Sequence, residues 1–170
     1  SAPVESRKQL IISNRAAFKM VDNSSDVFSL LKKVCSLQEE RAYTYKLFEE
    51  GHKIYLSTAP NYDFATFREL VCEVTQEFKR ISEGVMDIER RLRVDCGSQH
   101  LAGFVAALQE EEKAKLELVA RLQLARQNIL DNPDQHGYQD DIKDMKQRLN
   151  KVVERINEHL EELKYEMNDL

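Results

Sequence analysis

The stretch DFATFRELVCEVTQEFKRISEGVMDIERRLRVD, residues 63–95, decides the fold of this chain. Its apolar residues recur at alternating spacings of four and three for almost four heptads without a polar interruption: Phe67, Val71, Val74, Phe78, Ile81, Val85, Ile88 and Leu92. A stripe with this spacing lies along one face of an α-helix and has to be buried against other helices. The stretch therefore predicts one long helix that packs lengthwise in an all-α protein.

Similar stripes predict further long helices on both sides of this stretch. One spans residues 26–57, after the capping side chains of NSSD (23–26). Another begins at Ser98 and ends near residue 130, and the last follows the loop DNPDQHG (131–137), whose Pro, Gly and Asx residues are typical of a turn. The stripes comprise Val27, Leu31, Val34, Gln38, Arg41, Tyr45, Phe48, His52 and Tyr55; Leu101, Phe104, Val105, Leu108, Leu116, Val119 and Leu122; and Ile142, Met145, Leu149, Val153, Ile156, Leu160, Leu163, Met167 and Leu170.

The lengths and connections of these helices predict their arrangement. Each has about 30 residues and is therefore about 45 Å long. Helices of equal length with short connections favour antiparallel neighbours. We expect an antiparallel up-down-up-down four-helix bundle over residues 25–170, preceded by a partly ordered N-terminal arm at residues 1–24. A long coiled-coil dimer is the alternative; the even spacing of the loops argues against it, and we expect a monomer.

Composition excludes several classes of protein. With 170 residues and a net charge of −5, the chain forms one domain whose surface has no overall attraction for nucleic acid or an anionic membrane. No apolar run approaches the ~18 residues of a membrane span. The three cysteines are odd in number and far apart, which indicates reduced thiols in an intracellular protein.

Clusters of like charge are interpreted as solvated surface. The basic groupings are small and diluted by acidic residues, so they do not form a DNA-binding stripe. The run Glu110–Glu112 interrupts the stripe of the third helix. We expect a solvated face there, or else a polar groove. The basic residues concerned are Arg7, Lys8, Arg15, Lys19, Arg90, Arg91 and Arg93.

No residue pattern predicts catalysis, a cofactor or a metal ion. Glu49 and His52 form the Glu-x-x-His motif of di-iron bundles, but such a site needs a second copy, which the sequence lacks. Cys96 and His100 supply fewer ligands than a structural zinc site requires. The sequence contains no glycine-rich phosphate loop and no G-x-S-x-G motif. We therefore expect a protein that is not an enzyme and binds no cofactor.

The turn after the first helix has a complete structural explanation. In FEEGHKIYLSTAPNYDF (48–64), Pro60 disfavours helical geometry at Ala59, so the helix has to end just before it. Asp63 is placed to cap the second helix. Tyr62 and Phe67 then occupy the positions of a hydrophobic staple.

Gly51, His52 and Tyr55, just before this turn, leave two interpretations open. Gly51 costs about 1 kcal/mol relative to alanine in a helix, which a close helix approach, a slight kink or the backbone of a partner would explain. His52 and Tyr55 either form a polar-lined core layer or belong to a docking surface for a partner chain, since aromatic residues are enriched at interfaces. Our candidate partner-binding residues are Gly51, His52, Tyr55 and Tyr62.

Polar residues on the stripe of the first helix need partners in the core. Antiparallel folding about the turn brings His52 close to Glu73, and it brings Arg41 close to Glu77 or Glu83. An unpaired buried charge is costly, so we expect these pairs across the first hairpin.

Residues 37–78 closely resemble the required-for-excision 1-B domain family. The pattern that carries the resemblance is LQ-x-ER, EEGH-x-x-YL, P-x-YDF and EVTQ-x-F, in this order along the chain. Its residues here are Leu37, Gln38, Glu40, Arg41, Glu49, Glu50, Gly51, His52, Tyr55, Leu56, Pro60, Tyr62, Asp63, Phe64, Glu73, Val74, Thr75, Gln76 and Phe78. Residues 1–36 and 97–170 share only a helical pattern with the family.

The resemblance implies a role in DNA excision repair and implies no enzymatic activity, cofactor or catalytic residue. We therefore expect a non-enzymatic helical module that binds protein partners, in the nucleus if it acts in repair and in the cytoplasm otherwise. The alternative is a structural helical tether or scaffold with only an indirect link to repair. Direct binding of DNA is disfavoured, because neutralisation of phosphates by Lys and Arg drives such binding.

Overall fold

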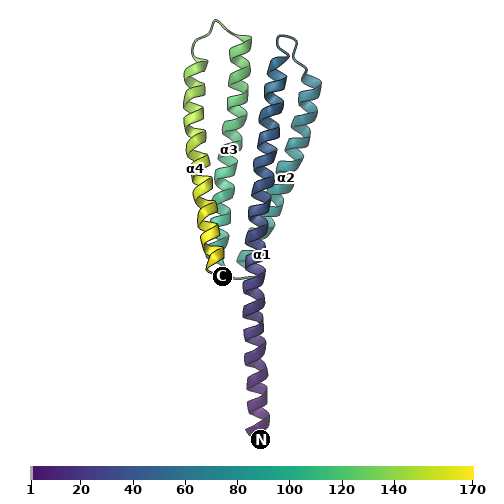
Figure 1. Ribbon diagram of the computed structural model, residues 1–170, viewed down its shortest axis with the longest axis vertical. Helices are drawn as coiled ribbons and strands as arrows, with labels where there is room; N and C mark the ends of the chain where they lie inside the picture. The colour runs from purple at the N-terminus through teal and green to yellow at the C-terminus, as the bar shows by residue number, and fades with distance from the viewer. Residues whose placement is uncertain (1) are drawn as a thin grey trace.

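The chain folds into the helices α1 (Ala2–Ser57), α2 (Phe64–Val94), α3 (Gln99–Asp131) and α4 (Tyr138–Asn168). The computed structural model describes residues 26–170, so the N-terminal arm predicted for residues 1–24 lies outside the described residues. α1 and α2 form one antiparallel hairpin, α3 and α4 form a second, and α2 joins the hairpins by packing against α3 (Figure 1). The prediction of an all-α, up-down-up-down four-helix bundle is confirmed.

The turn between α1 and α2 has the predicted chemistry. α1 ends at Ser57, and the peptide bond between Ala59 and Pro60 is cis. Asp63 is the N-cap of α2: its Oδ1 accepts a hydrogen bond from the backbone N–H of Thr66 at 3.3 Å, and its Oδ2 accepts one from the Thr66 hydroxyl at 2.8 Å. The capping role predicted for Asp63 is therefore confirmed.

The turn between the two hairpins depends on a glycine. Gly97 has a φ of 63°, a left-handed conformation that glycine adopts without steric cost. The backbone N–H of Ser98 donates to the carbonyl of Leu92 at 2.8 Å, which closes the end of α2. Ser98 is the N-cap of α3, as predicted, although its side chain makes no capping hydrogen bond.

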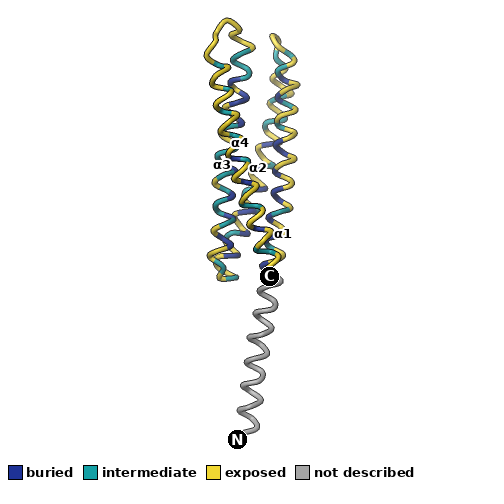
Figure 2. Tube along the Cα trace, turned by 60° about the vertical axis from the view of Figure 1, so that its left-hand side comes forward, coloured by how far each residue is buried: buried dark blue, intermediate teal, exposed yellow. Residues whose placement is uncertain are grey.

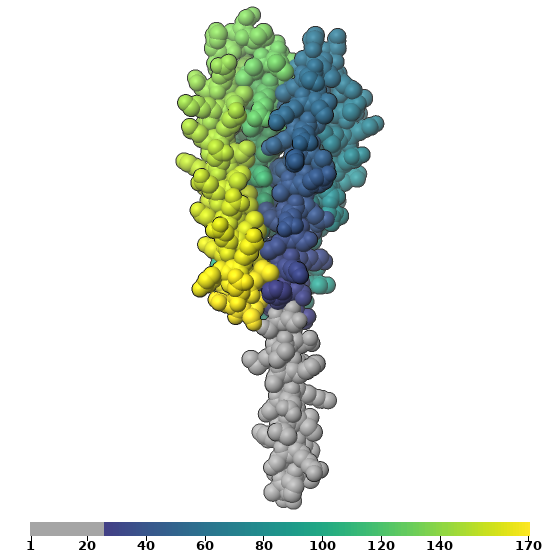
Figure 3. Space-filling view, viewed as in Figure 1, coloured from purple at the N-terminus to yellow at the C-terminus, as the bar shows by residue number. Residues whose placement is uncertain are grey.

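The core follows the stripe of α2. This stripe is buried from Val74 to Leu92, and it is half-buried at Phe67 and Val71 near the turn (Figure 2). Most of the buried apolar residues form one cluster around Ile81 and Val85, and a smaller cluster lies around Phe78. The space-filling view shows the two hairpins lying against each other (Figure 3). The first half of α4, residues 138–151, follows the loop between α3 and α4 and is half-buried or exposed.

Candidate protein-binding site on the α1–α2 hairpin

A layer of buried polar side chains connects α1 with α3. Arg41, which is 3% exposed, donates hydrogen bonds to Gln38 Oε1 at 2.9 Å and to Gln109 Oε1 at 2.7 Å. The side-chain amide of Gln38 donates in turn to the carboxylate of Glu112. The buried guanidinium is thus connected to a buried carboxylate through an amide, which offsets part of the cost of burying its charge. We call Gln38, Arg41, Gln109 and Glu112 the polar layer.

The partners predicted for Arg41 were assigned to the wrong helix. Glu77 pairs with Arg80, and Glu83 is exposed on α2. The prediction counted residues back from the turn, which aligns α1 only with α2. The Arg41 side chain instead extends to the second hairpin and donates a hydrogen bond to Gln109 on α3. The expectation of a polar partner in the core is confirmed, and the assignment of that partner to α2 is wrong.

Glu112 corrects the prediction of a solvated face at residues 110–112. Glu110 is exposed, and Glu111 forms an ion pair of 2.9 Å with Arg155 on α4, but Glu112 is only 6% exposed. The stripe of α3 therefore continues through the acidic run, with a carboxylate in place of an apolar residue. The alternative interpretation of a polar groove describes this run better, because Glu110 and Glu112 line a hollow of about 310 Å³ together with Arg41 and Gln109.

Tyr45 and Lys115 adjoin the polar layer. The Nζ atom of Lys115 lies 4.0 Å from the centre of the Tyr45 ring, which is a cation–π contact. Burial lowers the pKa of the Lys115 ammonium group and raises the pKa of the Tyr45 hydroxyl. That hydroxyl stays protonated and points to the carbonyl oxygen of Glu112, 3.5 Å away. Both side chains serve packing and charge balance in the core.

Aromatic rings pack together where α1 meets the turn. The Tyr55 ring stacks on Phe67 with 4.4 Å between the centroids and lies 4.9 Å from the ring of Tyr62. His52 lies 5.6 Å from Phe67. Tyr62 and Phe67, which were predicted to form a staple, are thus joined through a third ring from α1. We call His52, Tyr55, Tyr62 and Phe67 the aromatic cluster.

His52 lies in the core without a carboxylate beside it. The predicted pair with Glu73 is wrong, because Glu73 is exposed on α2. Burial and the positive charge of Arg126 lower the pKa of His52, which favours the neutral imidazole. A neutral ring can pack against aromatic neighbours without a counter-charge. Tyr55 is buried beside it, so the core-layer interpretation describes both residues, and partner binding by them stays a prediction.

Gly51 leaves room on α1 for a side chain of α2. A Cβ atom at position 51 would lie 1.8 Å from Cδ2 of Leu70, which occupies the space that any other residue would fill. Of the explanations left open for this glycine, the close helix approach is the one the structure shows. Gly51 itself is half-buried, and Leu70 covers it from the side of α2.

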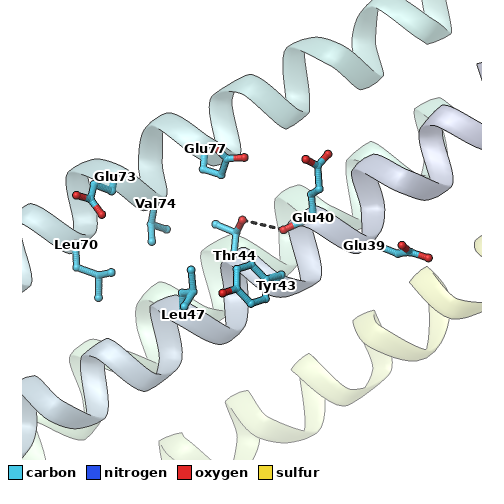
Figure 4. Close-up of a pocket in the computed structure, with 9 residues that line it drawn as sticks. All are labelled: Glu39, Glu40, Tyr43, Thr44, Leu47, Leu70, Glu73, Val74 and Glu77. Atoms are coloured by element: carbon cyan, nitrogen blue, oxygen red, sulfur yellow. Dashed lines mark hydrogen bonds between the residues drawn. The ribbon is translucent and has the colours of Figure 1, made fainter.

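The outer face of the α1–α2 hairpin is hollowed. A hollow of about 550 Å³ lies between the two helices (Figure 4). Leu47 lines it from α1, and Leu70 and Val74 line it from α2. Tyr43, at one side, is 63% exposed, and Leu47 is 39% exposed. An exposed concave surface with these side chains is typical of a protein-binding site.

A second hollow continues the first toward the turn. It has a volume of about 240 Å³, is lined by Gly51, Ile54 and Phe67, and shares Leu70 with the larger hollow. Ile54 at its edge is 66% exposed. We call the two hollows together the α1–α2 groove. Gly51 and Tyr55 line it, so two of the predicted partner-binding residues contribute to its wall.

Acidic side chains surround the larger hollow. Glu39 and Glu40 come from α1, and Glu73 and Glu77 come from α2. Arg80 bridges Glu40, at 3.0 Å, and Glu77, and so neutralises one end of the groove. Within residues 26–170, Glu39 and Glu73 take part in no ion pair. The groove therefore combines apolar walls with acidic side chains, of which Glu73 faces no basic residue in the lining.

Sequence reasoning missed the exposed part of this site. Tyr43, Leu47 and Ile54 lie off the buried stripe of α1, at spacings of four and seven residues. Both spacings place side chains on one face of a helix. Apolar residues repeated on the solvent side of an otherwise charged helix were the signal that could have identified the groove.

Other kinds of site are absent from the part of the chain that the structure describes. In residues 26–170, no group of three His, Cys, Asp or Glu side chains comes together as a metal ion would require. None of the helices, as far as they are described, is long and apolar enough to cross a membrane. Cys35, Cys72 and Cys96 are free.

Comparison with known proteins assigns the family. The model of the family described as "DNA repair REX1-B" matches residues 29–126. This chain belongs to the DNA repair REX1-B family. A Required for excision 1-B domain-containing protein of Bos taurus is 36% identical over 139 residues, which cover 81% of this chain and 74% of the relative. One of Mus musculus is 31% identical over 140 residues, covering 82% and 80%. No solved structure matches this chain.

The family match is longer than the resemblance that sequence reasoning found. Residues 97–126, which were related to the family only by a helical pattern, belong to the matched region. That region contains the whole polar layer and the whole α1–α2 groove. The region that matches the family therefore includes most of α3 as well as α2 and most of the described part of α1.

Proposed function

We propose that this chain is a non-enzymatic protein-interaction module of DNA excision repair. The observation that carries the proposal is the α1–α2 groove, which lies within the region matched by the DNA repair REX1-B family. Its exposed Tyr43, Leu47 and Ile54 have no role in the core, whereas a docked partner would bury them. Burial of such side chains is the main source of affinity in protein interfaces.

The proposed partner is a protein rather than DNA. The chain carries a net charge of −5, and the rim of the groove is acidic, so both would repel a phosphate backbone. We propose that the protein acts as a monomer, with one groove for each bundle. The repair role calls for its presence in the nucleus.

The proposal is tested by separating the groove from the rest of the surface. Tyr43→Glu and Leu47→Asp place charges on the side of the groove that α1 forms. Tyr165→Glu and Leu130→Asp are matched controls, because these side chains on α4 and α3 are 68% and 48% exposed and do not line the groove. Cells that lack the protein would be complemented with each variant and exposed to ultraviolet light.

We expect the two groove variants to slow the removal of ultraviolet lesions and the controls to restore it fully. Circular dichroism melting of the purified variants would establish that all of them fold. Normal lesion removal by both groove variants would refute the proposal. In that event a helical tether with an indirect link to repair would become the better explanation.

A further inference from the structure

The exposed apolar residues of the groove form a straight strip along α1. Tyr43 and Ile54 are eleven residues apart, so the strip extends about 16 Å along the helix axis. Leu70 and Val74 of α2 form the opposite wall at the level of Leu47 (Figure 4). A long apolar trough between two helices fits the apolar face of a third helix, which inserts side chains at spacings of three, four and seven residues.

The charges beside the trough identify the flanks of that third helix. Glu73 on α2 takes part in no ion pair within residues 26–170. Glu39 on α1 takes part in none either, but it also lines a hollow with Lys115 and Lys164 and points away from α2 (Figure 4). No lysine or arginine is among the described residues that line the larger hollow. A helix seated in the trough would therefore be selected if it carried Lys or Arg beside its apolar face, opposite Glu73, because complementary charge directs docking and excludes other partners.

We infer that the α1–α2 groove binds one amphipathic, positively charged helix of a partner protein, seated lengthwise between Tyr43, Leu47 and Ile54 on one side and Leu70 and Val74 on the other. The inference rests on the proposed function and names the chemistry of its partner. An extended peptide is a poorer fit, since helical walls offer no free backbone groups with which a strand could pair.

The test uses the full chain, labelled with ¹⁵N, and three synthetic peptides of about 18 residues, which form ~27 Å of helix. The first peptide has leucines on one face and lysines and arginines on both flanks. The second replaces every basic residue of the first with glutamate. The third keeps the composition of the first but scrambles the order, so that no apolar face forms. Fluorescence anisotropy measures affinity, and amide chemical shifts locate the bound peptide.

We expect only the first peptide to bind, with shift changes confined to residues around Leu47 and Leu70. Glu73→Lys should weaken its binding by about tenfold, as the loss and reversal of one well-placed charge does. Glu83→Lys is the matched control, because Glu83 is exposed on the same helix and does not line the groove; its affinity should equal that of the wild type.

Four results would each overturn the inference: no binding of the first peptide, equal binding of the acidic or the scrambled peptide, shift changes on another face, or dimerisation of the chain through the groove. Failure here is distinguishable from failure of the proposed function. If the first peptide does not bind but Leu47→Asp still impairs repair, the groove serves repair through a partner of different chemistry. If the peptide binds but Leu47→Asp repairs lesions normally, the proposed function fails instead.

Discussion

The hydroxyl group of Tyr62 donates a hydrogen bond to Oδ1 of Asp131, with 2.7 Å between the two oxygens. Tyr62 lies in the turn between α1 and α2, and Asp131 is the last residue of α3, so this bond links the tips of the two hairpins. The carboxylate favours the protonated phenol and raises the pKa of Tyr62 to about 12. The hydrogen bond between the hairpins can therefore be detected by measuring the pKa of Tyr62.

We predict that Tyr62 titrates well above the ordinary pKa of tyrosine, about 10. In the folded chain it should ionise near pH 12. The Asp131→Asn variant should lower the pKa of Tyr62, because the negative acceptor is gone. NMR titration of ¹³Cζ-labelled tyrosine measures both values.

The sign of the linked stability follows from the raised pKa. The folded chain holds the phenolic proton more tightly than the unfolded chain, whose tyrosines ionise near about pH 10. The contribution of this hydrogen bond is therefore complete below about pH 10 and is lost as the pH rises toward 12. Ionisation of Tyr62 near pH 10, the ordinary pKa of tyrosine, would contradict the bond.

We predict that Arg41→Ala and Glu112→Ala each destabilise the bundle by about 3–5 kcal/mol, because either change leaves a buried charge without compensation. Chemical denaturation followed by circular dichroism measures the free energy of unfolding. Glu110→Ala, on the exposed side of the same run, is the control and should change the free energy by less than about 0.5 kcal/mol.

The double variant Arg41→Ala, Glu112→Ala tests whether the two buried charges stabilise the fold jointly or independently. Its loss of unfolding free energy should be clearly smaller than the sum of the two single losses, because each single variant leaves one buried charge without its partner and the double variant leaves none. Simple additivity would show that Gln38 does not couple the two charges as the hydrogen bonds indicate.

We predict that acidification weakens the bundle through His52. Its pKa is lowered by burial and by Arg126, so the unfolded chain binds the proton more readily than the folded one. The stability conferred by the neutral ring is complete above about pH 6.5, the ordinary pKa of histidine, and falls as the pH drops below it. Denaturation curves at neutral and mildly acidic pH measure this slope.

A histidine outside the core provides the control for that slope. His52→Gln should flatten the dependence on pH, whereas His136→Gln, in the exposed loop between α3 and α4, should leave it unchanged. If both variants retain the wild-type slope, another titrating group accounts for it.

We predict that Gly51→Ala changes binding more than stability. Alanine gains about 1 kcal/mol of helix propensity, but its Cβ displaces Leu70 into the groove. These effects oppose each other, so the free energy of unfolding should shift by less than about 1 kcal/mol while affinity for the basic amphipathic peptide falls.

Gly103→Ala is the matched control: nothing lies within 4 Å of its added Cβ, so it should stabilise the fold without affecting binding. Unchanged affinity in Gly51→Ala would show that the position of Leu70 does not matter to the partner.

We predict no appreciable affinity for intact or damaged duplex DNA at physiological salt. The net charge of −5 and the acidic rim of the groove oppose contact with phosphates. Fluorescence anisotropy with labelled duplexes is the measurement. Sub-micromolar binding that weakens steeply as salt is raised would contradict the prediction.

The sequence predicted the helices and their turns because their causes are local. The uninterrupted stripe of α2, the proline after α1 and the cap at Asp63 all act within a few residues, and each was located correctly. The partners of Arg41 and His52 could not be obtained in this way. They depend on how one hairpin is placed against the other, and no periodicity along a single helix contains that information.

The burial of Glu112 within the acidic run 110–112 also could not be predicted from the neighbouring residues. Glu110 and Glu112 have the same chemistry, and only the helical phase set by the whole of α3 makes one solvated and the other buried. The groove could not be predicted from the apolar stripes, because those stripes consist of the residues that form the core. The groove is indicated in the sequence by three apolar residues that lie off the core stripe of α1: Tyr43, Leu47 and Ile54.

The polar layer also fixes the axial register of the bundle. Apolar stripes tolerate a slip of one heptad, because each apolar residue then meets another of the same kind. The positions seven residues before and after Glu112 are Val105 and Val119, both buried. A slip of α3 by one heptad along α1 would therefore set Gln38 against a valine. It would also replace Gln109, the acceptor of Arg41 on α3, by Ala102 or Leu116 and leave the charge of Arg41 without that partner in the core. Polar residues in such positions select one alignment at some cost in stability, and here that alignment sets the first hairpin against the second.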